Sequence, residues 1–135
     1  MPLALPQYVR DYPEVALVPI VANVQSAQTL CETWQKDYQR LPDAFILENC
    51  KLIGGHFASQ CEELDVSTIE TTIAQLRGYL DRLGISIPII VTGGIWNRFD
   101  IDLMFAIGAD GVQIGTRFIT TEECDADRQY KEFHL

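Results

Sequence analysis

The sequence predicts an α/β protein that forms half of a TIM-type (β/α)8 barrel, in which four parallel strands alternate with helices. Four short apolar runs alternate with helical segments, the pattern of a parallel sheet whose crossovers are helices. The chain has 135 residues, whereas a complete barrel has eight such units and roughly 250 residues. Turns that contain glycine directly follow the last two apolar runs, where barrels often bind phosphate.

The first two strands are expected at Leu17–Ala22 and Ala44–Glu48, because both segments are short and apolar. Leu17–Ala22 has the composition of a strand that is buried on both faces. Ser26 is the expected N-cap of the helix between them. Large apolar and aromatic residues recur at every fourth position of this helix: Leu30, Trp34 and Tyr38.

A polar, glycine-bearing loop is expected from Asn49 to about Val66. Ser67 and Glu70 then form an S-x-x-E capping box, which predicts the start of a helix. This helix should run to about Leu83, because Gly84 supplies a C-terminal stop.

The third strand is expected at Ile87–Thr92, and either Asn97 or Asp100 should begin the helix after it. Gly108 is the expected end of that helix. Its buried side is predicted to carry four residues: Ile101, Met104, Phe105 and Ile107.

The fourth strand is expected at Gly111–Ile114, followed by a last helix that begins near Thr120. Thr120 and Glu123 form a second capping box, and the helix should include Tyr130 and Phe133.

Composition and charge place the chain among globular proteins and restrict its partners. Its length and its 47% hydrophobic content predict a single domain over residues 1–135. A net charge of −9 argues against a nucleic-acid partner, although backbone amides can still bind a small anion. No apolar run is long enough to span a membrane, and the N-terminus lacks a secretion signal. The four cysteines lack the spacing of metal ligands, so we expect reduced thiols, no metal and a cytoplasmic location.

Two glycine-bearing turns are the candidate ligand site. Gly93 and Gly94 follow the third strand, and Gly115 and Thr116 follow the fourth. Glycine lets backbone amides approach a phosphate closely, Thr116 adds a hydroxyl donor, and Arg117 adds charge. The competing interpretation is that these glycines only form tight turns. A doubly wound sheet is the competing architecture, but the chain has neither a GxGxxG motif nor a P-loop.

These residues resemble the nitronate monooxygenase family, to which the flavin-dependent enoyl-ACP reductases are related. The resemblance is carried by the residues Ile87–Ile95, by Asp100 and Ile101, and by Gly108–Phe118. It continues at Phe45–Glu48 followed by Gly54-Gly55-His56, and at Thr121–Cys124 with Tyr130-Lys131. It covers the chain from about Val18 to the end.

The resemblance implies an FMN-containing TIM barrel. It implies that amides of Gly93, Gly94, Gly115 and Thr116 bind the FMN phosphate. It also implies that Gly54 and Gly55 pass close to the flavin, and that His56 is the catalytic base. The matching histidine of the monooxygenases is proposed to remove the proton alpha to a nitro group, a role that suits imidazole because it titrates near neutral pH. Three positions depart from the family pattern: Asn49 and Ala58, each in place of a glycine, and Trp96 in place of a small residue.

Three functions stay open at this point. The first is an FMN-dependent oxidoreductase that oxidises alkyl nitronates with dioxygen, with an enoyl-ACP reductase or an NAD(P)H-dependent flavin reductase as alternatives. The second is a non-catalytic remnant that binds only the phosphate, and the third is a nucleotide-phosphate barrel. A half-barrel has two open edges and an uncovered apolar face. We therefore expect self-association or pairing with a missing N-terminal half.

Overall fold

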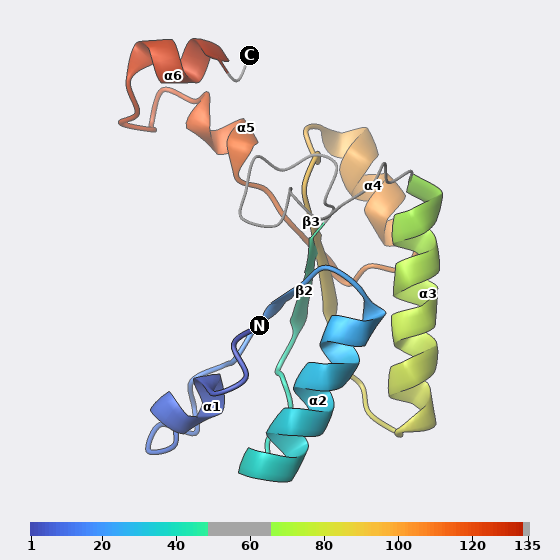
Figure 1. Ribbon diagram of the computed structural model, residues 1–135. Helices are drawn as coiled ribbons and strands as arrows, with labels where there is room; N and C mark the ends of the chain where they lie inside the picture. The colour runs from blue at the N-terminus through green and yellow to red at the C-terminus, as the bar shows by residue number, and fades with distance from the viewer. Residues whose placement is uncertain (49–65, 134–135) are drawn as a thin grey trace.

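The protein contains one four-stranded parallel sheet with helices between its strands (Figure 1). Its structure is a computed structural model that describes residues 1–48 and 66–133. The elements are α1 (Leu5–Tyr8), β1 (Ile20–Val21), α2 (Val24–Tyr38), β2 (Phe45–Glu48), α3 (Val66–Arg82), β3 (Ile89–Thr92), α4 (Arg98–Ala106), β4 (Gly111–Gln113), α5 (Thr116–Ile119) and α6 (Arg128–Phe133).

The strand order distinguishes between the two architectures that the sequence left in competition. The strands lie in chain order, β1-β2-β3-β4, and every pair is parallel. Figure 1 shows α2, α3 and α4 on the same side of the sheet. A doubly wound sheet reverses its strand order and places helices on both faces. A barrel instead keeps the chain order and has all its helices outside. The prediction of a partial barrel is therefore confirmed.

The two faces of the sheet differ in how well they are covered. The register places Val21, Leu47 and Val91 side by side in one row, and all three are buried under the helices. On the opposite face of the sheet, Ile20 pairs in register with Ile46 and is 44% exposed. The expectation that the first strand is buried on both faces is thus wrong for the described residues, because no helix covers the inner face.

The core lies between the sheet and the inward sides of α2 and α3. Phe45 and Ile89 pair in register and are fully buried. The buried residues of the helices recur at helical spacing, which gives each helix one apolar side. They are Ala27, Leu30, Cys31 and Trp34 in α2, and Ile69, Ile73, Leu76 and Leu80 in α3.

An aspartate joins β4 to β3 at the amino ends of the strands. The amide of Asp110 donates to the carbonyl of Ile89 at 2.8 Å, and its carboxylate accepts from the amide of Ile89 at 2.7 Å. Arg77 forms an ion pair with Asp110 and donates to the carbonyl of Ile87 at 3.2 Å.

The same arrangement recurs between the segments that lead into β1 and β2. The amide of Asp43 donates to the carbonyl of Leu17 at 2.9 Å, and its carboxylate accepts from the amide of Leu17 at 2.6 Å. Arg40 pairs with Asp43 at 3.2 Å and donates to the carbonyl of Val15 at 2.6 Å. We call these two arrangements the aspartate clamps. Each clamp provides hydrogen-bond partners for backbone groups that the short strands leave unpaired.

Two of the predicted helix starts need correction, and a third is confirmed. Asn23, not Ser26, is the N-cap of α2, and its side chain accepts from the amide of Ser26 at 2.8 Å. Ser67 lies within α3 and is therefore not its N-cap. Asn97 is the N-cap of α4, and Asp100 completes a capping box with it. Gly84 and Gly108 follow α3 and α4 closely, as predicted.

The C-terminal segment differs most from the prediction. Thr116–Ile119 forms the short helix α5, and Thr120 is its C-cap rather than the N-cap of a final helix. The Thr120 hydroxyl donates to the carbonyl of Arg117 at 2.9 Å. The final helix α6 begins only at Arg128. On α4, Met104 is buried as predicted, but Phe105 is 47% exposed, so its placement on the buried side was wrong.

No helix among residues 1–48 and 66–133 is both long enough and apolar enough to cross a membrane.

Candidate functional site

The two glycine-bearing turns form a single pocket at the carboxyl ends of β3 and β4. The strands are adjacent, with Thr92 paired to Gln113, so the turns that follow them emerge side by side. The Thr92 hydroxyl also donates to the carbonyl of Gln113 at 3.0 Å. The pocket has a volume of about 390 Å³ and is lined by Ile20, Glu48, Thr92, Gly93, Gly94, Ile95, Trp96, Gln113, Ile114, Gly115 and Thr116.

Gly93 and Gly94 have backbone conformations that favour glycine. Their φ angles are 100° and 70°, in the left-handed region that residues with a Cβ rarely adopt. Two successive residues of this kind turn the chain sharply just after β3. These glycines do form a tight turn, as the competing interpretation expected. The same turn lines the pocket, so its formation is compatible with ligand binding.

Neither backbone conformation nor crowding by the described residues requires glycine at position 115. Its φ is −116°, which any residue can adopt. A Cβ added there would meet no atom within 4 Å, so the space beside this backbone is open. Thr116 follows directly and lines the same pocket. Open space next to a main chain is what the close approach of a phosphate requires.

The described lining of the pocket contains Glu48 and no basic residue. The nearest cation in sequence is Arg117, which directly follows Thr116. Its Cζ atom lies 5.2 Å from the ring centroid of Trp96, within the range of a cation–π interaction. Sequence analysis left Trp96 without a stated partner, and the structure shows that it stacks with Arg117.

Of the predicted site residues, the structure brings together Gly93, Gly94, Gly115 and Thr116. Gly54, Gly55 and His56 lie outside the described residues. Glu48 lines the pocket and immediately precedes the segment that contains them.

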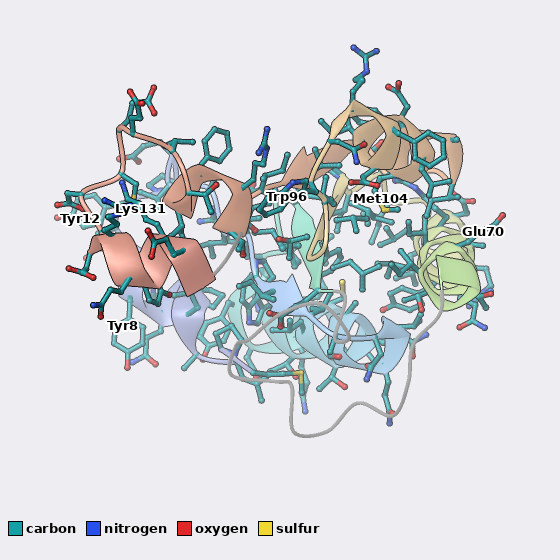
Figure 2. The ribbon with its side chains drawn as sticks, turned by 90° about the horizontal axis from the view of Figure 1, so that it is seen from above. Tyr8, Tyr12, Glu70, Trp96, Met104 and Lys131 are labelled. Atoms are coloured by element: carbon teal, nitrogen blue, oxygen red, sulfur yellow. The ribbon has the colours of Figure 1, made fainter. Side chains whose placement is uncertain are left out.

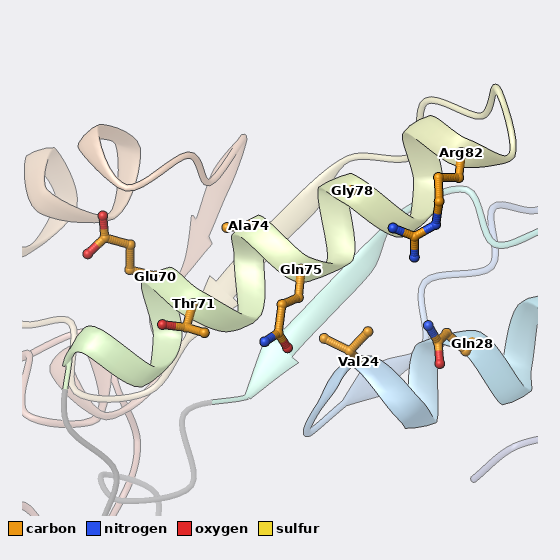
Figure 3. A pocket seen from close by; sticks show the side chains of 8 residues that line it. All are labelled: Val24, Gln28, Glu70, Thr71, Ala74, Gln75, Gly78 and Arg82. Carbon is orange, nitrogen blue, oxygen red and sulfur yellow. The ribbon is translucent and has the colours of Figure 1, made fainter.

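A second concavity lies between α2 and α3, on the outer surface of the helices (Figure 3). It has a volume of about 700 Å³ and is lined by Val24, Gln28, Glu70, Thr71, Ala74, Gln75, Gly78 and Arg82. Chemistry in barrels is carried by the strand-end loops. This groove is lined only by helical residues, so the smaller pocket is the candidate site.

Comparison with known proteins identifies a family and related folds. The family model described as nitronate monooxygenase matches residues 8–134. A protein named probable nitronate monooxygenase from Staphylococcus aureus strain JH9 is 29% identical over 90 residues, which are 67% of this chain and 24% of that protein. The protein of the same name from Staphylococcus saprophyticus is 40% identical over 47 residues, 35% of this chain and 13% of that protein.

Solved structures share the fold over most of the chain. The FabK (M276A) mutant from Thermotoga maritima is 28% identical, with a TM-score of 0.67, over 97% of this chain and 37% of that one. Nitroalkane oxidase from Streptomyces ansochromogenes is 22% identical, with a TM-score of 0.62, over 87% of this chain and 31% of that one. The chain thus spans between about an eighth and a little over a third of these proteins.

Proposed function

The chain belongs to the nitronate monooxygenase family, and from this premise we propose that its glycine-turn pocket binds the phosphate of FMN in a flavin-dependent oxidoreductase. The observation that carries the proposal is the meeting of Gly93, Gly94, Gly115 and Thr116 in one pocket at adjacent strand ends. Barrels commonly bind phosphate at the ends of their last two strands.

The residues that are present fit a phosphate group. The turn at Gly94 and the open space beside Gly115 let main-chain amides face a ligand without steric hindrance. The Thr116 hydroxyl is a further donor on the same side. When bound, FMN would supply the electron transfer, while this chain's residues bind and orient it.

We propose that the reaction is the oxidation of alkyl nitronates with dioxygen, and that His56 is the base that accepts a proton from a nitroalkane. The resemblance of Gly54-Gly55-His56 to the family motif supports this role. Histidine suits it because its pKa ordinarily lies near neutral pH. A cytoplasmic location belongs to the same proposal, and the free thiols of Cys31 and Cys124 support it.

Two measurements test the proposed function. Purified protein incubated with FMN and then desalted should retain yellow colour and consume oxygen when a nitronate is added. His56→Asn should reduce nitroalkane turnover more than nitronate turnover, because only the nitroalkane needs a base. Equal losses of turnover with both substrates would show that His56 does not act as the base. Protein that retains no flavin would support the phosphate-binding remnant instead.

Reductase chemistry is the second candidate. The resemblance of the sequence motifs includes the flavin-dependent enoyl-ACP reductases, which are related to the nitronate monooxygenase family. Oxidation of NAD(P)H by the flavin-loaded protein, with an enoyl thioester or free flavin as acceptor, would identify an enoyl-ACP reductase or a flavin reductase.

We further propose that β/α units from a second copy or a separate N-terminal half cover the inner face of the sheet. Ile20 is 44% exposed on this face, and Val18, just before β1, is 36% exposed. β1 and β4 are the edge strands of the described sheet and have backbone groups available for pairing. If a second copy covers this face, sedimentation velocity should show self-association, and a monodisperse monomer over a wide concentration range would contradict that form of the proposal.

A further inference from the structure

Trp96 and Arg117 reach each other from the two different turns that form the pocket. Trp96 lies in the turn after β3 and lines the pocket, whereas Arg117 lies in α5, after β4. The guanidinium carbon lies 5.2 Å from the ring centroid. Figure 2 shows Trp96 between α4 and α5. The pair therefore spans the two turns that supply the glycines.

The backbone at Trp96 is held in place by the start of α4. The amide of Trp96 donates to the carboxylate of Asp100 at 2.9 Å, and the amide of Asn97 donates to the same oxygen at 3.0 Å. Asp100 is itself part of the capping box that begins α4. The ring that Arg117 stacks on is thus attached to a capped helix, which restricts where the guanidinium can lie.

The Trp96–Arg117 pair brings a positive charge near a pocket whose described lining has none. The described lining carries the carboxylate of Glu48 and no basic side chain, although a phosphate monoester carries close to two negative charges at neutral pH. Main-chain amides offset only part of that charge. A guanidinium suits the remainder, because its planar array of donors matches phosphate oxygens and it stacks well on aromatic rings.

We propose that Trp96 positions Arg117 as the phosphate-binding cation of this pocket, which makes the site selective for a terminal phosphate monoester. Arg117 contacts the ligand, and Trp96 is a positioning residue that acts through it. The inference rests on the proposed function, because it assumes that the glycine turns bind a phosphate.

The test compares FMN with riboflavin, which lacks the phosphate, as ligands of the full chain. Flavin fluorescence titrations give Kd for the wild type and for Arg117→Gln, Trp96→Leu, Trp96→Phe and the double variant Trp96→Leu/Arg117→Gln. The matched control is Arg98→Gln, which removes the same charge two residues from Trp96, at a side chain that is 84% exposed and pairs with Asp102.

Arg117→Gln should weaken FMN binding by about tenfold or more, the usual effect of losing a charge-assisted hydrogen bond. Trp96→Leu should weaken it about threefold, and Trp96→Phe less, because phenylalanine keeps an aromatic face. The double variant should bind FMN no more weakly than Arg117→Gln alone, since Trp96 acts through Arg117. Riboflavin affinity should stay unchanged in every variant, and Arg98→Gln should match the wild type.

The outcomes separate this inference from the proposed function. If the wild type binds FMN no better than riboflavin, the phosphate pocket itself is wrong and the inference is overturned with it. If the wild type prefers FMN and Arg117→Gln keeps that preference, the pocket stands and the role of Arg117 is overturned. Additive losses in the double variant would overturn the positioning role of Trp96.

Discussion

Asp110 and Ile89 exchange two hydrogen bonds, one through the backbone of Asp110 at 2.8 Å and one through its carboxylate at 2.7 Å. Asp43 and Leu17 do the same at the other edge of the sheet, where the chain leads into β1 and β2. In each case an arginine pairs with the aspartate and donates to the carbonyl two residues before the bonded residue: Ile87 for Arg77 and Val15 for Arg40. Arg77 lies within α3, whereas Arg40 follows the end of α2. Their common geometry therefore reflects a shared need for hydrogen-bond partners for the backbone groups where the strands begin.

The clamp at Asp110 should contribute to stability at neutral pH and lose that contribution in acid. Burial raises the pKa of Asp110, but the amide of Ile89 and the guanidinium of Arg77 outweigh it, so the pKa is lowered overall. A lowered pKa in the folded state adds stability above the unfolded pKa, and this is lost as the pH falls through the folded value. Asp110→Asn should reduce the free energy of unfolding by about 1–2 kcal/mol at pH 7.

Urea unfolding at pH 7 and at pH 3 measures this effect. The difference between wild type and variant should shrink at pH 3, because this pH lies below the ordinary pKa of an aspartate and the unfolded state takes up a proton that the folded clamp disfavours. Asp102→Asn is the matched control, because Asp102 forms an exposed i,i+4 pair with Arg98 and should change stability by less than about 0.5 kcal/mol. If the loss of stability in Asp110→Asn does not change with pH, the carboxylate charge does not contribute to the stability of the clamp.

Trp34→Phe should reduce the free energy of unfolding by less than is usual when a buried tryptophan is replaced. Trp34 is fully buried, and its indole nitrogen has no hydrogen-bond partner among the described residues. Phenylalanine removes this unsatisfied donor, which offsets part of the loss in packing. We expect a loss below about 2 kcal/mol in urea unfolding, against about 3–5 kcal/mol for Trp34→Ala. Equal losses in the two variants would show that the indole ring is satisfied or tightly packed at its nitrogen.

The glycines of the pocket should respond differently to alanine. Gly94→Ala places a Cβ at a φ of 70° and should reduce stability by about 1–2 kcal/mol. Gly115→Ala meets open space at an ordinary φ, so unfolding should change by less than about 0.5 kcal/mol. Its added methyl group lies beside the pocket, so FMN affinity should still fall. If Gly115→Ala binds FMN as the wild type does, the ligand does not approach Gly115.

Cys31 should resist alkylation in the folded protein. Burial, with a smaller contribution from the charge of Glu32, raises the pKa of its thiol to about 11. Since the thiolate is the reactive form, labelling by iodoacetamide at pH 8 should be at least about 100-fold slower at Cys31 than at the partly exposed Cys124. Peptide mass spectrometry distinguishes these sites from Cys50 and Cys61. Labelling of Cys31 should accelerate after unfolding in urea, and equal rates in the folded protein would contradict its burial.

The order of the elements was readable from the sequence because apolar runs and helical spacing are strong local signals. The four strands and α2, α3 and α4 were all expected. Helix ends were less accurate: Asn23 and Ser26 are both good caps, and only the backbone geometry shows that Asn23 acts as one. Phe105 was misplaced because α4 is short, and Met104 alone is fully buried on it.

The glycines of the site and the charge of Arg117 were predictable, whereas the contact between Arg117 and Trp96 was not. Gly93 and Gly115 follow adjacent strands in the sequence, so parallel topology alone brings them to one edge. Trp96 and Arg117 lie 21 positions apart and meet only through the conformations of the two turns. The clamps were missed as well, although an aspartate just before a strand, at Asp43 and again at Asp110, is a signal that could have suggested them.

The Asp110 clamp and the glycine turns lie at opposite ends of β3 and β4. Sliding β4 by one residue along β3 would break both bonds of the Asp110 clamp and turn Val112 to the other side of the sheet. The alignment of β3 and β4 is thus secured at the strand ends away from the glycine turns. Substitutions at Gly94 and Gly115 should therefore leave this alignment intact, so that changes in FMN affinity can be measured apart from changes in strand register.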